Sequence, residues 1–347
     1  MFQRHIHSFR AIAITAVVAQ HCTNSVVWDQ GSSVHSVLAA GIFGASIWFT
    51  FISGFLFQYL SPRFTTAKYL KAKLRNVIAP YLIMSIPALV ISAFVIHQDS
   101  VPPSFYDLPG WQRIALFVLT GKHLAPFWYI PVIAIFYLGG ALFVRMDRAK
   151  WPYLLLIPLA IASATLGRDG FQGLLQSQMG DDVLWAPVGH AAYLVAPYLF
   201  GMFCSRYQDR ILNMTAEEIN LLLAIALIAF AINVHYFHGE ESDAALFVFK
   251  MATCPLLLWG TYRLSDAISD RMATIADYSF GIYFVHGYIL AAVNMIAPYT
   301  ILGTVLAYGG MAAWLVLLAS VLMACTFIIT SSKRYVLGTS NRLVMGC

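Results

Sequence analysis

The chain has 347 residues, of which 60% are hydrophobic and only 11% are Asp, Glu, Lys or Arg, and its formal net charge is +5. A soluble domain carries roughly 25% charged residues, so this composition excludes a water-soluble globular protein, and the 24 Phe, 18 Tyr and 8 Trp exclude a disordered one. We therefore expect an all-α, polytopic integral membrane helix bundle. It is expected to form a single transmembrane domain over residues 1–347 and to bind no nucleic acid.

Apolar stretches of about twenty residues, bounded by charges, Gly or Pro, predict about ten membrane-spanning helices. The connections between them are too short for a separate extracellular catalytic domain, so any chemistry is expected within the helix bundle or at its mouths. The longest connections cover 97–123 and 167–183. The predicted spans lie near residues 8–27, 37–60, 76–96, 124–145, 151–166, 184–204, 217–237, 244–262, 274–296 and 301–330.

The distribution of basic residues predicts that both termini are cytoplasmic. We expect the protein to lie in the inner (plasma) membrane. Lys and Arg concentrate on the cytoplasmic side when loops are short. With the N-terminus inside, sixteen of the 21 Lys and Arg residues fall in inner segments. Outer loops and their borders keep only Arg113, Lys122, Arg168 and Lys250.

The cysteines are scattered and lie mostly in apolar runs, so their spacing indicates neither a disulfide framework nor a zinc site. We expect no metal. The five cysteines are interpreted as small core residues: Cys22, Cys204, Cys254, Cys325 and Cys347.

The first predicted span contains two ionisable residues, Arg10 and His21. At about 1.5 Å of rise per residue they are separated by roughly 16 Å, and because eleven residues make close to three turns, both project from one face. An ionisable residue inside a membrane is a functional hypothesis by default. Two other interpretations remain open, in which Arg10 reaches the lipid headgroups and His21 bonds a neighbouring helix.

Other polar and aromatic groups are predicted at a similar depth. Trp128, Tyr129 and His190 fall in the outer halves of their spans, whereas Tyr283 and His286 lie near the middle of the ninth. Trp and Tyr near an interface are ordinarily belt residues, and His190 stands between Gly and Ala as a helix-packing residue would. His286 in the middle of a span is the hardest to explain in this way.

A basic cluster precedes the third predicted span. Lys68, Lys71, Lys73 and Arg75 have no acidic neighbour before Pro80. Such a cluster attracts anionic lipid headgroups. Alternatively, it holds the phosphates of a cytoplasmic nucleotide cofactor.

Five motifs follow one another along nearly the whole chain and together resemble one family. They are Arg10-x10-His21, Phe51-Ile52-Ser53-Gly54-Phe55-Leu56, Val77-Ile78-Ala79-Pro80-Tyr81, the stretch from His123-Leu124 through Phe127-Trp128-Tyr129 to Phe136-Tyr137-Leu138, and Tyr278-Ser279 with Ile282-Tyr283 and His286. In this order they resemble the membrane-bound acyltransferase-3 family, whose members modify bacterial surface polysaccharides.

Two positions depart from the family pattern. Many members carry Arg-x-x-Arg before the third-helix Pro, whereas Lys71, Lys73 and Arg75 have another spacing. A Glu that one large branch carries beside the fourth-helix Phe-Tyr-Leu is replaced by apolar residues at 133–135. The sequence is more similar to the short branch of the intercellular-adhesin type, which modifies exopolysaccharides, and it lacks the fused extracytoplasmic hydrolase-like domain of longer relatives.

The resemblance implies transfer of an acetyl or succinyl group from acetyl-CoA, or another acyl-CoA, onto a hydroxyl of a surface polysaccharide or lipid-linked glycan. The reaction would take place among membrane lipids, with polysaccharide synthase or export partners. His21 is expected to act as general base or as a transient acyl-histidine, and Arg10 to act with it and to bind the anionic end of CoA. Lys71, Lys73 and Arg75 are further donor-binding candidates. The expected substrate-binding residues are Ser53, Trp128, Tyr129, Tyr283 and His286.

Two alternatives belong to other functional classes. In a glycan exporter or flippase the same polar groups would line a translocation path, and no acyl donor would bind. In a structural subunit of a polysaccharide synthase they would only hold helices together, and Arg10 and His21 would tolerate substitution. Binding of acetyl-CoA to the purified protein separates these classes from an acyltransferase.

Overall fold

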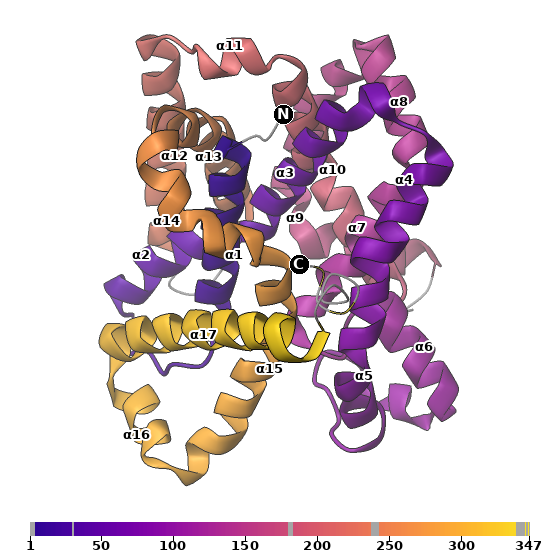
Figure 1. Cartoon of the computed structure of the whole chain (residues 1–347), viewed down its shortest axis with the longest axis vertical. Coiled ribbons are helices and arrows are strands. Elements are labelled where there is room, and N and C mark those ends of the chain that lie inside the picture. The colour runs from indigo at the N-terminus through magenta and orange to yellow at the C-terminus, as the bar shows by residue number, and fades with distance from the viewer. Residues whose placement is uncertain are drawn as a thin grey trace. The chain divides into compact units, whose positions relative to one another are not determined.

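The computed structural model describes residues 4–29, 31–179, 183–236, 243–337, 344 and 346 (Figure 1). Over these residues the chain forms helices and no β-strand, which confirms the predicted all-α class. Eight described helices are long and apolar enough to cross a membrane. The number rises to nine if one bent pair of helices is counted as a single span. The chain is therefore a multi-pass membrane protein.

The helices pack into two compact units. The first unit is Met1–Tyr59 with Pro197–Ser331, and the second is Leu60–Ala196 with Ser332–Cys347. The first contains α1 (Arg4–Thr23), α2 (Ser33–Ile42), α3 (Ala45–Leu60), α11 (Gln208–Leu212), α12 (Ala216–Tyr236), α13 (Asp243–Arg263), α14 (Ser265–Asp277), α15 (Ser279–Ile296), α16 (Ile301–Tyr308) and α17 (Gly310–Ser332). The second contains α4 (Thr66–Lys73), α5 (Ala79–Phe94), α6 (Gly110–Thr120), α7 (Tyr129–Leu138), α8 (Gly140–Ala149) and α9 (Leu156–Met179), and α10 (Trp185–Arg206) begins in the second unit and ends in the first.

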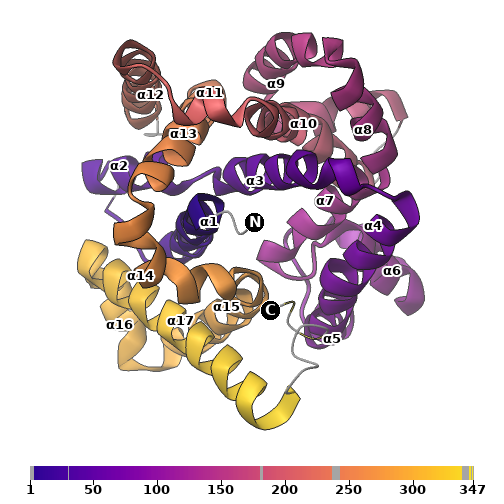
Figure 2. The ribbon, with the colours of Figure 1, turned by 45° about the horizontal axis from the view of Figure 1, so that its top comes forward.

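Helix α1 occupies the interior of the first unit. It corresponds to the first predicted span, but it is not among the eight apolar helices because it carries Arg10, Gln20 and His21. It packs against α2, α13, α14 and α15, and Figure 2 shows it enclosed by α3 and these helices. Because the surrounding helices cover it, Arg10 and His21 are only partly exposed.

Three predicted boundaries were wrong. The span expected over 301–330 is broken between Tyr308 and Gly310 into α16 and α17. Figure 1 shows that these two helices meet at an angle. The connection expected over 97–123 contains α6, and the one expected over 167–183 is largely helical because α9 continues to Met179. A kink at Gly167, which has a φ of 63°, separates the two parts of α9.

Helices α3 and α10 cross at two glycines of the first unit. A Cβ atom at Gly54 would overlap the carbonyl oxygen of Tyr198, and one at Gly201 would overlap the carbonyl oxygen of Phe51. Close crossings of this kind require residues without a side chain. The packing explains why Gly follows Ser53 in the second motif.

The described cysteines agree with the prediction that they are small core residues. Cys22, Cys204, Cys254 and Cys325 are buried and free. Cys347 lies outside the described residues.

In the second unit, α6 and the helical segment over 125–138 are bent by 69°. Gly121 ends α6 with a φ of 71°, a left-handed conformation that other residues adopt only with strain. His123 fills the inside of the bend: its Nδ1 lies 3.0 Å from the carbonyl oxygen of Phe117 and its Nε2 lies 2.8 Å from Oγ of Ser85. A carbonyl oxygen only accepts, so Nδ1 donates and Nε2 accepts from the serine hydroxyl.

Replacing His123 by leucine is expected to destabilise the second unit. The change removes two buried hydrogen bonds, each worth about 0.5–1.5 kcal/mol. The carbonyl oxygen of Phe117 keeps the backbone N–H of Gly121 as a partner. Thermal unfolding of the purified protein in detergent measures the loss. Ser85→Ala removes one of the two bonds and should cost about half as much; equal melting temperatures for His123→Leu and wild type would contradict this account.

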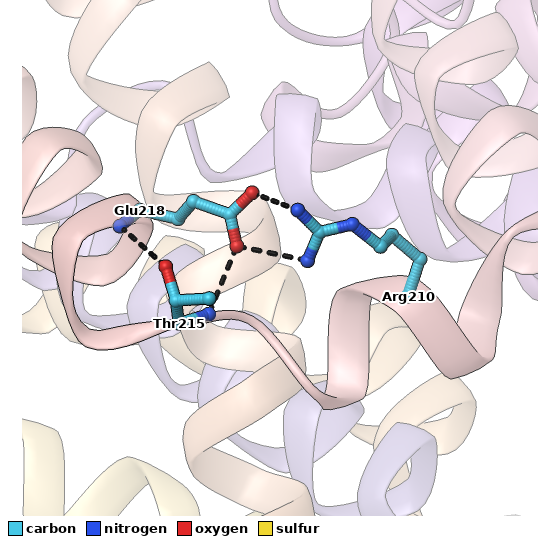
Figure 3. A network of polar contacts seen from close by, with 3 residues as sticks. All are labelled: Arg210, Thr215 and Glu218. Carbon is cyan, nitrogen blue, oxygen red and sulfur yellow. Dashed lines mark hydrogen bonds and ion pairs between the residues drawn. The ribbon is translucent and has the colours of Figure 1, made fainter.

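The start of α12 is stabilised by a capping box (Figure 3). The backbone N–H of Glu218 donates to Oγ1 of Thr215, and the Glu218 carboxylate accepts from the backbone N–H of Thr215 at 2.9 Å. The guanidinium of Arg210, on α11, donates to both carboxylate oxygens of Glu218. These exposed contacts satisfy donors that the first turn of a helix leaves free.

Candidate active site

Two polar side chains of α1 contact α15 within the first unit. Nη2 of Arg10 donates to Oγ of Ser279 at 2.7 Å. The imidazole rings of His21 and His286 have centroids 5.3 Å apart and planes tilted by 44°. The polar face of α1 predicted from the sequence is therefore directed at α15.

The pairing of these residues shows that α1 and α15 run in the same direction. Arg10 near the start of α1 meets Ser279 at the start of α15, and His21 near the end of α1 meets His286 seven residues further along α15. The two polar contacts are separated by roughly 10 to 16 Å along the helices. The cation and the imidazole thus occupy different levels of one helix pair.

Burial differs among the members of this group. Ser279 and His286 are 1% and 0% exposed, and Tyr283 is also buried, whereas Arg10 and His21 are partly exposed. The surface that this group presents therefore belongs to Arg10 and His21 and not to the residues of α15. Tyr283 lies beside His286 with ring centroids 6.3 Å apart.

The bonded partner of Arg10 is a neutral hydroxyl. The carboxylate of Asp277 interacts electrostatically with Arg10, but it is exposed and lies 3.2 Å from Nε2 of His7. Because water screens an exposed carboxylate, Asp277 offsets only part of the positive charge of Arg10, and the remainder can attract an anionic ligand. Ser53, the remaining candidate of this unit, lies on α3 and is partly exposed.

The basic candidates of the second unit lie where α4 meets α5. Residues Leu74–Ile78 form a π-helical turn, in which the N–H of Ala79 bonds to the carbonyl of Leu74. The wide turn is explained by Pro80, whose ring would clash with the carbonyl four residues earlier in a regular α-helix.

This turn separates the three cations into two environments. Lys71 and Arg75 are exposed. Nζ of Lys73 instead lies over the rings of Tyr137 and Tyr69, at 4.5 and 5.4 Å from their centroids. Lys71 and Arg75 are therefore the better candidates to bind an anion, while Lys73 contributes a cation–π contact.

Trp128 and Tyr129 belong to a separate cluster of the second unit. The ring of Trp128 makes edge contacts with His190 at 5.1 Å and with Tyr129 at 5.9 Å. The guanidinium of Arg168 lies 5.9 Å from the centre of the Trp128 ring. The three residues predicted in the outer halves of their spans therefore lie in contact: Trp128, Tyr129 and His190.

The prediction that Lys250 lies at an outer border was wrong. It lies inside α13 and is 0% exposed. Its ammonium donates to the carbonyl oxygen of Gly41 at 2.7 Å and sits 3.6 Å from the centre of the Trp48 ring. Gly41 is in the last turn of α2, so Lys250 satisfies a carbonyl that the end of that helix leaves free.

Sequence reasoning did not find Ser279 as the partner of Arg10. A signal was present, because Ser279 precedes His286 by seven residues, or two turns, and the two therefore share a face of α15. Matching this polar face to that of α1 would have paired the helices. Periodicity within one helix does not by itself identify the partner helix.

A family model described as an acyltransferase domain matches residues 4–330. No curated protein matches the chain, and no solved structure does.

Proposed function

Because the chain belongs to the acyltransferase-3 family and is a membrane acyltransferase, we propose that it transfers an acetyl or succinyl group from acyl-CoA onto a hydroxyl of a surface polysaccharide or lipid-linked glycan. The observation that carries the proposal is the helix pair α1–α15, which holds a cation at one level and a partly exposed imidazole at another. The inner membrane and an exopolysaccharide acceptor of the intercellular-adhesin type are part of this proposal.

The separation of the two groups on α1 suits a long, thin acyl donor. Arg10 and His21 are about 16 Å apart along the helix, which is of the order of the pantetheine arm of CoA. We assign Arg10 to an anionic group of the donor, through charge-assisted hydrogen bonds. His21 then lies at the level of the thioester.

His21 is assigned as the general base. It removes the proton of the acceptor hydroxyl while the hydroxyl oxygen attacks the thioester carbon. The C–O bond forms, the C–S bond breaks, and the CoA thiolate leaves with the electron pair. Ser53 and Tyr283 of the first unit are proposed contacts of the acceptor. Trp128 and Tyr129 of the second unit remain predictions from the sequence.

Mass spectrometry of the surface glycan, from cells with and without the protein, tests the proposed function. We expect a fixed mass increment per modified sugar only when the protein is present, and the increment distinguishes acetyl from succinyl. Proteoliposomes provide the second test: glycan isolated from cells that lack the protein should gain the group when acetyl-CoA is added. Export of an unmodified glycan with no use of acetyl-CoA would establish a transporter instead.

Arg10→Ala is expected to raise KM for acetyl-CoA by about 10- to 100-fold, because a hydrogen bond to a charged group is worth about 1.5–3 kcal/mol. Arg10→Lys keeps the charge but loses the fork of donors, so an intermediate KM is expected. Initial rates of thiol release measure both. Arg4→Ala removes an exposed cation from the start of the same helix and serves as the control. Unchanged KM in Arg10→Ala would remove Arg10 from the donor site.

The double variant Lys71→Ala/Arg75→Ala is expected to raise KM for acetyl-CoA by about 3- to 10-fold and to weaken its dependence on salt. Exposed cations act through screened electrostatics, with a Debye length of about 8 Å at physiological ionic strength. KM measured between low and high salt tests this. Arg145→Ala/Arg148→Ala, which removes two exposed cations elsewhere in the second unit, is the matched control. If KM stays constant, the cluster contacts lipid headgroups alone.

A further inference from the structure

His286 is a polar residue in a fully buried position of α15. Its Nδ1 lies 2.8 Å from the carbonyl oxygen of Ile282, one turn earlier on the same helix. Because a carbonyl oxygen can only accept, Nδ1 carries the hydrogen and donates it. In the neutral imidazole Nε2 is then an acceptor.

This acceptor is left unsatisfied. Within the part of the chain that the structure describes, Nε2 of His286 is buried and has no hydrogen-bond partner. A buried acceptor without a partner costs about 1–3 kcal/mol, whereas an apolar side chain of similar size would fill the position at no such cost. Nε2 can therefore accept one further hydrogen bond from a neighbouring group.

The ring of His21 is the neighbour that can supply this bond. Two imidazoles joined by one N–H···N bond of ordinary length have centroids about 5 Å apart, because each nitrogen lies roughly 1 Å from the centre of its ring. The observed separation is 5.3 Å. The bond from Nδ1 to the backbone of α15 also turns the opposite edge of the His286 ring, with Nε2, away from its own helix.

The two histidines differ in access. His21 is partly exposed, and His286 is closed off. Of the two rings, only that of His21 presents surface to a substrate. This order resembles a general base with a second group behind it that orients the base and stabilises its charged form.

We propose that His286 is a positioning residue that accepts a hydrogen bond from His21 through Nε2. The inference rests on the proposed function. One nitrogen of His21 takes the acceptor's hydroxyl proton, and the N–H at its other nitrogen donates to His286. The hydrogen bond holds the His21 tautomer that leaves the reactive nitrogen free and strengthens as His21 becomes positively charged. The proton taken from the hydroxyl stays on His21 until the CoA thiolate or water removes it.

The test compares substitutions at His286 in the full-length protein in proteoliposomes, with acetyl-CoA and glycan isolated from cells that lack the protein. His286→Leu fills the space without an acceptor. It is expected to lower kcat by about 10- to 100-fold while KM for acetyl-CoA stays within about twofold. His286→Gln, whose amide oxygen can take the place of Nε2, should recover most of kcat.

Comparison of His286→Asn with His286→Gln separates loss of the hydrogen-bond acceptor from loss of the fold. His286→Asn presents its amide near the position of Nδ1 and leaves no acceptor at the position of Nε2, so its kcat should fall well below that of His286→Gln at a similar melting temperature. Wild-type kcat in His286→Leu, or equal losses in the Gln and Asn variants, would overturn the inference. In either case the wild type still transfers acetyl groups, whereas absence of transfer by the wild type would overturn the proposed function itself.

Discussion

Replacing His21 by alanine is expected to lower the rate of acyl transfer by about 10²- to 10⁴-fold, the contribution typical of a general base. Without the imidazole, the acceptor hydroxyl must attack the thioester while it still holds its proton. KM for acetyl-CoA should change little, because donor binding is assigned to cations elsewhere. Thiol release and glycan acylation, measured in proteoliposomes with equal amounts of inserted protein, give both constants.

The control makes the same substitution at a histidine outside the candidate site. His35 lies in α2 of the same unit, is partly exposed and stacks on Trp28 with ring centroids 4.9 Å apart. His35→Ala should retain wild-type kcat. Full transfer by His21→Ala would show that another group takes the proton.

His21 is also the residue on which a covalent intermediate would form. If His21 attacks the thioester itself, rapid quenching during turnover should yield a peptide with an acylated His21. Direct transfer leaves this peptide unmodified at every time point. Peptide mass spectrometry after millisecond mixing separates the two routes.

Gly54→Ala is expected to disrupt the folding of the first unit. The added Cβ atom would overlap the carbonyl oxygen of Tyr198, which belongs to the rigid backbone of α10 and cannot rotate away. Helices α3 and α10 must then separate, and overpacking of this kind costs about 1–3 kcal/mol or more. The melting temperature in detergent and the yield of monodisperse protein measure the loss.

A second glycine of the same unit gives a matched control. Gly260, in α13, has no atom within 4 Å of the position that a Cβ would occupy. Gly260→Ala should therefore leave the melting temperature unchanged or raise it, since alanine favours a helix by about 1 kcal/mol over glycine. Similar melting temperatures for Gly54→Ala and Gly260→Ala would disprove the close crossing.

Much of the architecture could be predicted because it depends on local pattern. Apolar runs identified the spans, because about twenty helical residues cross the bilayer's hydrocarbon core, which is about 30 Å thick. The helix also satisfies every backbone hydrogen bond within itself. The Arg10–His21 spacing likewise predicted a shared face, because it depends only on the helical repeat. Neither the apolar runs nor the Arg10–His21 spacing depends on which helices are neighbours.

The features that sequence reasoning missed depend on contacts between distant segments. Ser279 is 269 residues from its partner Arg10, and no periodicity connects them. Lys250 resembled a border cation because its hydrogen-bond acceptor, the carbonyl oxygen of Gly41, belongs to a distant segment and is free only because α2 ends there. The break before Gly310 was hidden because the run on either side of it is equally apolar.

The shared direction of α1 and α15 constrains how the polypeptide threads the bilayer. If both cross in the same sense, an even number of passes separates their starting points. If α1 crosses as well, it contributes seven passes together with the six segments before α15 that are long and apolar enough to cross. In that case the bent segment over 110–138 supplies the eighth and carries the chain through to the opposite leaflet. A hairpin that dipped in and came back would have left α15 inverted beside α1, with Ser279 far from the guanidinium that it binds.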